Sequence, residues 1–286
     1  MCGFHTQGSR CDLPRCAQGG SSLEDKFTKS NFMTISEEAL NFQLKALYPV
    51  KVEKDPTCVN LVFLNHDRNF STFLTIRYLV AHERVVDVYT LSRSMFESVV
   101  TMGLLAKRLI PNDLERYQDF QYIDVHRTYN HLRKLGLEDL SGVPSSNAEL
   151  LTKKRQEYIQ KYGRNVQSWS GKSVEQNVKL IDGNYAPTCN EKHFYEYLYC
   201  QVYRRGSESV HSSFAGLAQG VRTEVLSIPG LITAQRFKAN ESHLIFSCFH
   251  SVLIFLSSVR FLGYLLDKKE TEDYFHKIAR YIVSEE

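Results

Sequence analysis

The chain has 286 residues, of which 43% are hydrophobic and 23% are charged, with 15 glycines and 7 prolines. This composition is that of a globular protein, and it excludes collagen, low-complexity scaffolds and wholly disordered chains. Lysine and arginine total 35 against 32 aspartate and glutamate residues, a formal charge of +3. Because this excess is small, a nucleic-acid or membrane partner has to be inferred from local clusters.

The cysteines and the start of the chain indicate a reducing compartment. The seven cysteines have no CxxC spacing, so we expect neither a disulfide framework nor a metal site. The first twenty residues lack the apolar segment of a secretory signal. We therefore expect a cytoplasmic protein without cofactor or metal.

Helical periodicity begins after a polar leader. Residues 1–33 show no apolar period and are interpreted as a flexible tail, followed by one helical domain over residues 34–286. Ser36, followed by Glu37 and Glu38, is typical of a helix start, and Pro49 marks the end of that helix. Further helices are expected at residues 57–81, 87–109, 113–135, 149–162, from 173, 191–204, 207–217, 241–266 and 271–283.

The segments between these helices contain turn-forming residues. Residues 141–146 are expected to form a loop, residues 181–190 are rich in turn residues, and residues 221–235 are expected to be irregular or extended. No segment shows sustained alternation of apolar and polar residues. The sequence therefore predicts an all-α fold, a multi-helix bundle in a single domain.

One apolar segment, residues 243–266, approaches the length of a membrane span. It contains His243, His250 and Arg260, and the apolar stretch between the last two is too short to cross a bilayer. We interpret it as a buried core helix and expect no membrane partner. A membrane-associated protein built on this segment is the less favoured alternative.

The stretch from Tyr199 to Phe214 combines basic, hydroxyl and imidazole side chains. An arginine beside a histidine suits metal-independent phosphodiester cleavage, because histidine can accept the proton of a ribose 2′-hydroxyl and arginine can stabilise charge on the phosphorane. On a regular helix, one side would be shared by Arg204, Ser207, Glu208 and His211. Arg205 would join this side only if Gly206 kinks the chain.

Arg93 and Glu97 form a second candidate site on an otherwise apolar helix. Their i, i+4 spacing permits an ion pair. A structural bridge is one interpretation. The other is a functional site, because charges that face a core are costly unless they have partners.

A basic stretch interleaved with aromatic residues is the third candidate. Tyr158, Tyr162 and Trp169 alternate with the charges, as in a groove that binds a nucleic-acid strand. A solvated helix face with one anchoring tryptophan explains the same pattern. The candidate nucleic-acid-binding residues are Lys153, Lys154, Arg155, Arg164, Trp169 and Lys172.

The other histidines are expected to have structural roles. His66, His82 and His250 are interpreted as core or surface groups, and His126 and His131 lie five residues apart, which does not suit a metal pair on a helix. No nucleotide-binding loop, zinc-protease motif or nucleophile elbow is present.

Taken in order, several motifs resemble a bacterial family of helical proteins known only as a domain of unknown function. They are Arg93-x-x-Phe96-Glu97, Trp169-x-Gly171-x-Ser173, Tyr199-x-x-x-Tyr203 and Ser209-x-His211, and the resemblance covers roughly residues 40–265. The spacing Arg205-x5-His211, or Arg204-x6-His211, also resembles the signature of HEPN-type helical proteins.

The HEPN resemblance implies a metal-independent ribonuclease of the toxin–antitoxin or phage-defence type that acts on RNA as a homodimer. It would make His211 and Arg204 or Arg205 the catalytic pair, with Arg93 and Glu97 as partners from another helix. The alternative is a non-catalytic helical module that binds a protein partner or small ligand, in which the same polar residues fix the register of the helices.

Overall fold

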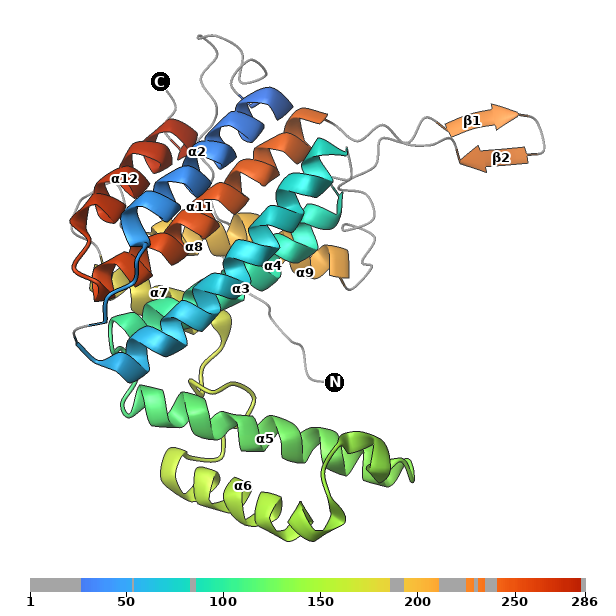
Figure 1. The fold of residues 1–286 in the computed structure, drawn as a ribbon. Coiled ribbons are helices and arrows are strands. Elements are labelled where there is room, and N and C mark those ends of the chain that lie inside the picture. The colour runs from blue at the N-terminus through green and yellow to red at the C-terminus, as the bar shows by residue number, and fades with distance from the viewer. Residues whose placement is uncertain are drawn as a thin grey trace, which may run out of the picture.

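The computed structural model describes residues 27–52, 54–82, 86–185, 193–210, 225–228, 231–234 and 241–283. This part of the chain is a helical bundle with one small β-hairpin (Figure 1), which confirms the predicted all-α class. The principal helices are α2 (Lys29–Leu47), α3 (Pro56–Ala81), α4 (Val86–Ala106), α5 (Asp113–Lys134), α6 (Ala148–Tyr162), α7 (Val174–Tyr185), α11 (Glu241–Leu265) and α12 (Lys269–Val283).

Helix α11 is the centre of the bundle and packs against α2, α3, α4 and α12 (Figure 1). Among the described helices, it is the one that is long and apolar enough to cross a membrane, yet 89% of its window Cys248–Leu265 is buried inside the fold. An apolar surface on all sides is what a helix surrounded by other helices requires. The prediction of a buried core helix agrees with this packing.

Arg260 shows how α11 accommodates a charge in the core. Its side chain is 1% exposed, and its Nε donates a hydrogen bond to Oε2 of Glu272 in α12 at 2.7 Å. The guanidinium also lies over the Phe275 ring, 4.4 Å from its centroid. Because a buried charge is costly without a partner, this pair binds α12 to the central helix.

Helix α2 begins earlier than the sequence predicts. Thr28 caps it by accepting a hydrogen bond from the backbone N–H of Asn31 at 3.1 Å, and Phe32 is fully buried in the core. Ser36 is therefore not the cap. It lies inside the helix, where its hydroxyl donates to the carbonyl of Met33 at 3.0 Å. The end of the predicted tail thus belongs to the folded bundle, because Phe32 needs an apolar environment.

Helix α7 has the predicted start but a later end. The Ser173 hydroxyl accepts a hydrogen bond from the N–H of Gln176 at 3.2 Å, and the Gln176 side chain accepts one from the N–H of Ser173 at 3.0 Å. This reciprocal cap fixes the helix start. The helix then continues to Tyr185 through residues expected to form a turn, because Ile181 is fully buried in the core.

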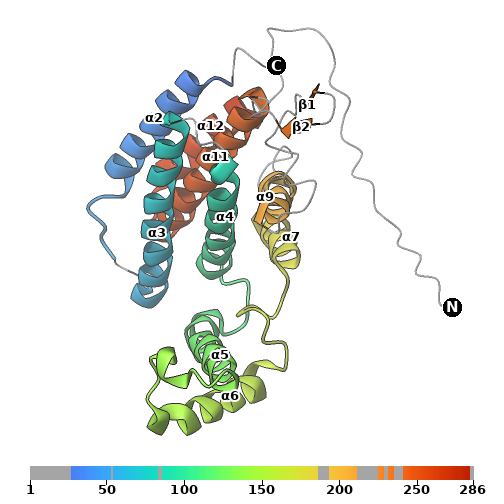
Figure 2. The ribbon, with the colours of Figure 1, turned by 90° about the vertical axis from the view of Figure 1, so that its right-hand side faces the viewer.

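A short irregular helical segment follows. It consists of α8 (Phe194–Leu198), the π-helix η4 (Tyr199–Arg204) and α9 (Arg205–Val210). The helix is thus continuous through residues 205–206, where the sequence predicted a break between two helices. Of these elements, η4 and α9 pack against α4, and α8 packs against α7. Figure 2 shows α9 beside α7.

Helices α5 and α6 form a pair set apart from the bundle (Figures 1 and 2). They are joined through the 3-10 turns η1 (Glu138–Ser141) and η2 (Ser145–Asn147), which overlap both ends of the predicted loop at residues 141–146. Gly136 closes α5 with a φ of +68°, a conformation that favours glycine. The pair packs edge to face through Phe120 and Tyr158, whose ring centroids are 5.9 Å apart.

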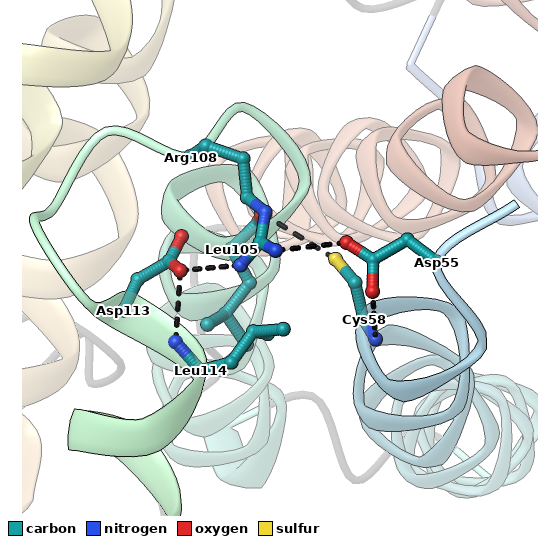
Figure 3. A network of polar contacts seen from close by, with 6 residues as sticks. All are labelled: Asp55, Cys58, Leu105, Arg108, Asp113 and Leu114. Carbon is teal, nitrogen blue, oxygen red and sulfur yellow. Dashed lines mark hydrogen bonds and ion pairs between the residues drawn. The ribbon is translucent and has the colours of Figure 1, made fainter.

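A polar network fixes the point where α5 leaves the bundle (Figure 3). Arg108, just after α4, forms ion pairs with Asp55 at the start of α3, at 2.8 Å, and with Asp113 at the start of α5. Asp55 also caps α3 by accepting from the N–H of Cys58 at 3.2 Å. One guanidinium thus connects three helix ends and sets the direction of the α5–α6 pair.

The one described element that is not helical is an antiparallel hairpin of β1 (Val225–Ile228) and β2 (Leu231–Ala234). Val225 pairs with Ala234 and Ile228 with Leu231. It extends away from the helices in Figure 1 and lies in the region expected to be irregular or extended. Such a small hairpin leaves the all-α class unchanged.

Candidate functional site

Helix α4 presents Arg93 and Glu97 as an ion pair, as their spacing predicts. Nε of Arg93 lies 3.4 Å from Oε1 of Glu97, and the two side chains are 20% and 46% exposed. Phe96, between them, is fully buried and anchors this face of the helix. The pair therefore lies at the edge of the core, where a ligand can reach the Glu97 side.

Two stacked tyrosines from the π-helix cover the arginine. The Arg93 guanidinium carbon lies 4.9 Å from the centroid of the Tyr203 ring. Tyr203 in turn stacks on Tyr199, with centroids 5.2 Å apart and an angle of 17° between the ring planes. Held by Glu97 on one side and an aromatic face on the other, the arginine is restricted in orientation. We call Arg93, Glu97, Tyr199 and Tyr203 the α4–η4 cluster.

Gly206 allows α9 to approach α4. A Cβ at this position would lie 2.8 Å from the Cβ of Arg93 and 2.9 Å from the carbonyl oxygen of Tyr89. The glycine is thus required for close packing. The kink at Gly206 that would bring Arg205 onto the face of Arg204 is not formed, because α9 continues directly from η4 and Arg205 has helical dihedrals.

The helix is irregular one turn earlier, in η4. A π-helix has a wider turn than an α-helix and is frequently found at functional sites. Here its wider turn covers Tyr199–Arg204, immediately before the close contact of Gly206 with α4. It therefore changes which faces are occupied by Arg204, its last residue, and by Arg205, which follows it, compared with a regular helix.

Arg204 and Arg205 have different surroundings. Arg204 is exposed, and its positive charge opposes the increase in the pKa of Tyr199 that burial causes. Arg205 is partly buried and acts in the same way on Tyr197, although burial still raises the pKa of Tyr197 to about 12. Arg204 therefore influences a member of the α4–η4 cluster, whereas Arg205 influences a tyrosine that contacts α11.

Ser207 is partly buried and hydrogen-bonded to its own helix. Its hydroxyl donates to the carbonyl oxygen of Tyr203 at 2.9 Å. The side chain of Glu208 and the whole of His211 lie outside the described residues. The structure therefore brings Arg93, Glu97 and the arginine-bearing segment together without describing the predicted histidine.

The basic stretch does not form one continuous charged groove. Lys154 pairs with Glu157 at 2.9 Å, which neutralises part of the stretch. Tyr158 is 2% exposed and packs between α5 and α6, so its ring is not available for stacking. The exposed members are Lys153, Arg164 and Lys172, and Arg155 is partly exposed.

Trp169 lies in the core, which argues against its predicted role in stacking on a base. It is 9% exposed, its Nε1 lies 3.4 Å from the hydroxyl of Thr101, and its ring meets Tyr117 edge to face at 5.2 Å. This is the anchoring tryptophan of the alternative interpretation, since its ring joins the α5 region to α4.

Sequence reasoning missed a pocket of about 530 Å³ between α5, α6 and the loop that follows. It is lined by Ile123, His126, Arg127, Asn130, His131, Lys134, Arg155 and Val166. The signal was present in α5, because polar residues at spacings of four form two adjacent stripes, 126/130/134 and 127/131. We call this the α5–α6 pocket.

The pocket is electropositive. Burial, and then the charge of Arg155, lowers the pKa of His126. Nδ2 of Asn130 lies 3.0 Å from Nε2 and 3.1 Å from Nδ1 of the His126 ring, so the unprotonated nitrogen of an uncharged imidazole can accept from this amide. His126 is therefore neutral near pH 7, and the fixed charges come from Arg127, Lys134 and Arg155.

The positions of three other histidines, His66, His82 and His250, agree with their interpretation as core or surface groups. His66 is fully buried and its Nδ1 lies 3.0 Å from the Ser258 hydroxyl, while His250 is 1% exposed and its Nε2 lies 2.8 Å from the hydroxyl of Tyr197. His82 lies exposed at the end of α3. In the described ranges, no three metal-ligating side chains cluster.

Comparison with known proteins identifies a family for the chain. No curated protein and no solved structure matches it at a significant level. The model of a family of unknown function, DUF5677, matches residues 59–224, which include the α4–η4 cluster and the α5–α6 pocket. This match covers more than half of the chain and confirms the resemblance to a family of unknown function. The protein therefore belongs to the DUF5677 family.

Proposed function

We propose that this protein is a metal-independent endoribonuclease whose site is the α4–η4 cluster together with Arg204 and His211. The single observation that carries the proposal is the contact of α4, which holds the Arg93–Glu97 motif, with the η4–α9 segment, which holds the Tyr199–Tyr203 motif. Arg93 lies 4.9 Å from the Tyr203 ring and its Cβ lies against Gly206, in the segment that leads to His211.

The cluster has the electrostatic character that a phosphodiester requires. Arg93 is oriented by Glu97 and Tyr203. Arg204 is exposed and lies in the same π-helix as Tyr199. A positioned arginine stabilises the charge that grows on the phosphorane oxygens, and it needs no reorganisation during the reaction.

His211 supplies the proton transfer in this proposal. Its imidazole accepts the proton of the ribose 2′-hydroxyl, whose oxygen attacks the adjacent phosphorus. The bond from phosphorus to the 5′-oxygen breaks, and that oxygen takes up a proton. The products are a 2′,3′-cyclic phosphate and a 5′-hydroxyl, so the product ends identify the mechanism.

The test is cleavage of a panel of structured and single-stranded RNAs by purified protein in EDTA. We compare the wild type with His211→Ala and determine the product ends by mass spectrometry. The matched control is His82→Ala, because His82 is exposed at the end of α3. The proposal predicts cyclic phosphate products from the wild type and from His82→Ala, and their loss in His211→Ala.

Two results would overturn it. Equal cleavage by the wild type and His211→Ala would show that another group, or a contaminant, is responsible. No cleavage of any RNA by correctly folded wild type would favour the binding module, in which the α4–η4 cluster serves to hold the helices in register.

The proposal includes a homodimer that brings two such sites together. Size-exclusion chromatography with light scattering, at the protein concentration used for cleavage, gives the mass of the species in solution. Activity of a species with the mass of a single chain, 33.0 kDa, would contradict the dimer but not the cleavage reaction.

A further inference from the structure

We infer that the α5–α6 pocket binds a nucleoside phosphate, either a free mononucleotide or the phosphorylated end of a nucleic-acid chain. The inference does not depend on RNA cleavage, because it concerns a different part of the fold. The pocket of about 530 Å³ has the size of sites that hold molecules of this class.

The phosphate is recognised by the charges in the lining. Arg127, Lys134 and Arg155 converge on the pocket, which has no aspartate or glutamate in its lining. Within the part of the chain that the structure describes, neither Lys134 nor Arg155 forms an ion pair. Two cations without a protein carboxylate, in a concave site, favour a ligand that carries more than one negative charge.

Arg127 adds a positioned donor. Its guanidinium donates to the carbonyl oxygen of Val166 at 2.8 Å and pairs with Asp124 at 3.0 Å, outside the lining. These contacts bind the loop after α6 to α5 and hold one wall of the pocket in place. The wall is thus formed before a ligand arrives.

The rest of the lining suits a nucleoside better than a bare phosphate. Ile123 is buried, and Val166 is partly buried on the facing loop, so both offer apolar contact to a flat ring. Asn130 and the neutral imidazole of His126 present donors and acceptors beside this apolar surface. An amide and an imidazole next to apolar side chains can recognise the edge of a base.

The test is isothermal titration of the full-length protein with adenosine 5′-monophosphate and, separately, with inorganic phosphate. The pocket variant is Arg155→Glu, and the matched control is Arg133→Glu, because Arg133 lies exposed on α5 and does not line the pocket. We expect the wild type to bind one mononucleotide per chain. We expect Arg155→Glu to weaken the binding at least about tenfold and Arg133→Glu to change it less than about twofold.

A second pocket variant protects the test from a folding artefact. Lys134→Glu alters the opposite helix, α5, and is expected to give the same loss as Arg155→Glu. Circular dichroism establishes that each variant is folded. Equal weakening by Arg133→Glu and Arg155→Glu would overturn the inference, because it would indicate non-specific attraction to the surface.

A parallel titration with a short single-stranded RNA, with and without a 5′-phosphate, distinguishes the two sources of the ligand. Binding of the mononucleotide that depends on Arg155 supports a free nucleotide. Binding of only the 5′-phosphorylated RNA, with the same dependence, supports a chain end. Failure of all these probes, or inorganic phosphate binding as tightly as the mononucleotide, would overturn the nucleoside assignment. The outcome is independent of the His211→Ala cleavage test.

Discussion

Gly206 of α9 packs directly on Arg93 of α4, so closely that a Cβ on the glycine would lie 2.8 Å from the Cβ of the arginine. The same added atom would lie 2.9 Å from the carbonyl oxygen of Tyr89, a backbone atom that cannot move without moving α4. This contact holds the arginine-bearing segment against the Arg93–Glu97 pair. The site proposed for RNA cleavage therefore depends on one residue without a side chain.

We predict that Gly206→Ala destabilises the fold by about 1–3 kcal/mol, the usual cost of inserting an atom into a packed contact. Urea unfolding measures the change. The control is Gly183→Ala in α7, where an added Cβ meets no atom within 4 Å. That substitution should stabilise the helix by about 0.5–1 kcal/mol, because alanine loses less conformational freedom than glycine. Equal effects of the two substitutions would contradict the close packing of Gly206.

We predict that Arg93→Ala lowers kcat/KM for RNA cleavage by about 100-fold or more, the usual effect of removing a positioned group that stabilises charge in the transition state. The control is Arg133→Ala, which removes the same charge from an exposed position near the end of α5. The control should cleave RNA at nearly the wild-type rate. Should Arg93→Ala retain full activity while folded, the α4–η4 cluster would not be the site.

His66 makes stability dependent on pH. Burial lowers its pKa to about 4 in the folded protein, against a usual value of 6.5. Between pH 4 and 6.5 the unfolded chain binds a proton at this residue that the folded chain excludes. The contribution of His66 to the free energy of unfolding is therefore fully present above about pH 6.5 and is lost as the pH falls towards 4. The difference is roughly 3 kcal/mol.

Urea unfolding at several pH values checks this prediction. The variant His66→Met removes the titrating ring, and it should show a smaller loss of stability between pH 6.5 and 4 than the wild type. His82→Gln replaces an exposed histidine and should behave like the wild type. The prediction is wrong if His66→Met and the wild type lose the same stability over this range.

We predict that Glu272→Ala destabilises the protein by about 3–5 kcal/mol, because it removes a carboxylate from Arg260, which is 1% exposed. Glu157→Ala, which breaks an exposed pair with Lys154, should cost less than about 1 kcal/mol. Chemical unfolding of both variants measures the difference.

A double variant tests the cause of that effect. Arg260→Met combined with Glu272→Leu removes both charges and should recover much of the stability lost in Glu272→Ala. If the double variant is less stable than Glu272→Ala, the cost arises from lost packing and not from the loss of the Glu272 carboxylate beside a buried charge.

The positions of most helices could be read from local patterns. The apolar period locates α3, α4, α6, α11 and α12, and Gly136 marks the end of α5, since these signals act between residues three or four apart. The charges within residues 243–266 also indicated a helix of the core. The i, i+4 ion pair of Arg93 and Glu97 was predictable for the same local reason.

What the tertiary structure decided depends on residues far apart in the sequence. The start of α2 follows from the burial of Phe32 against α11, since its ring meets that of Phe249. The sequence left Trp169 open to two roles, stacking on a base or anchoring the fold, and its contacts with Thr101 and Tyr117 place it in the core. The α5–α6 pocket exists because Arg155 of α6 faces a polar stripe on α5, more than twenty positions earlier in the sequence.

Sequence by itself determined where helices form and which residues share a face, because those interactions are local. Only packing decided which faces are buried and which charges meet, because that depends on how distant helices fill the space between them.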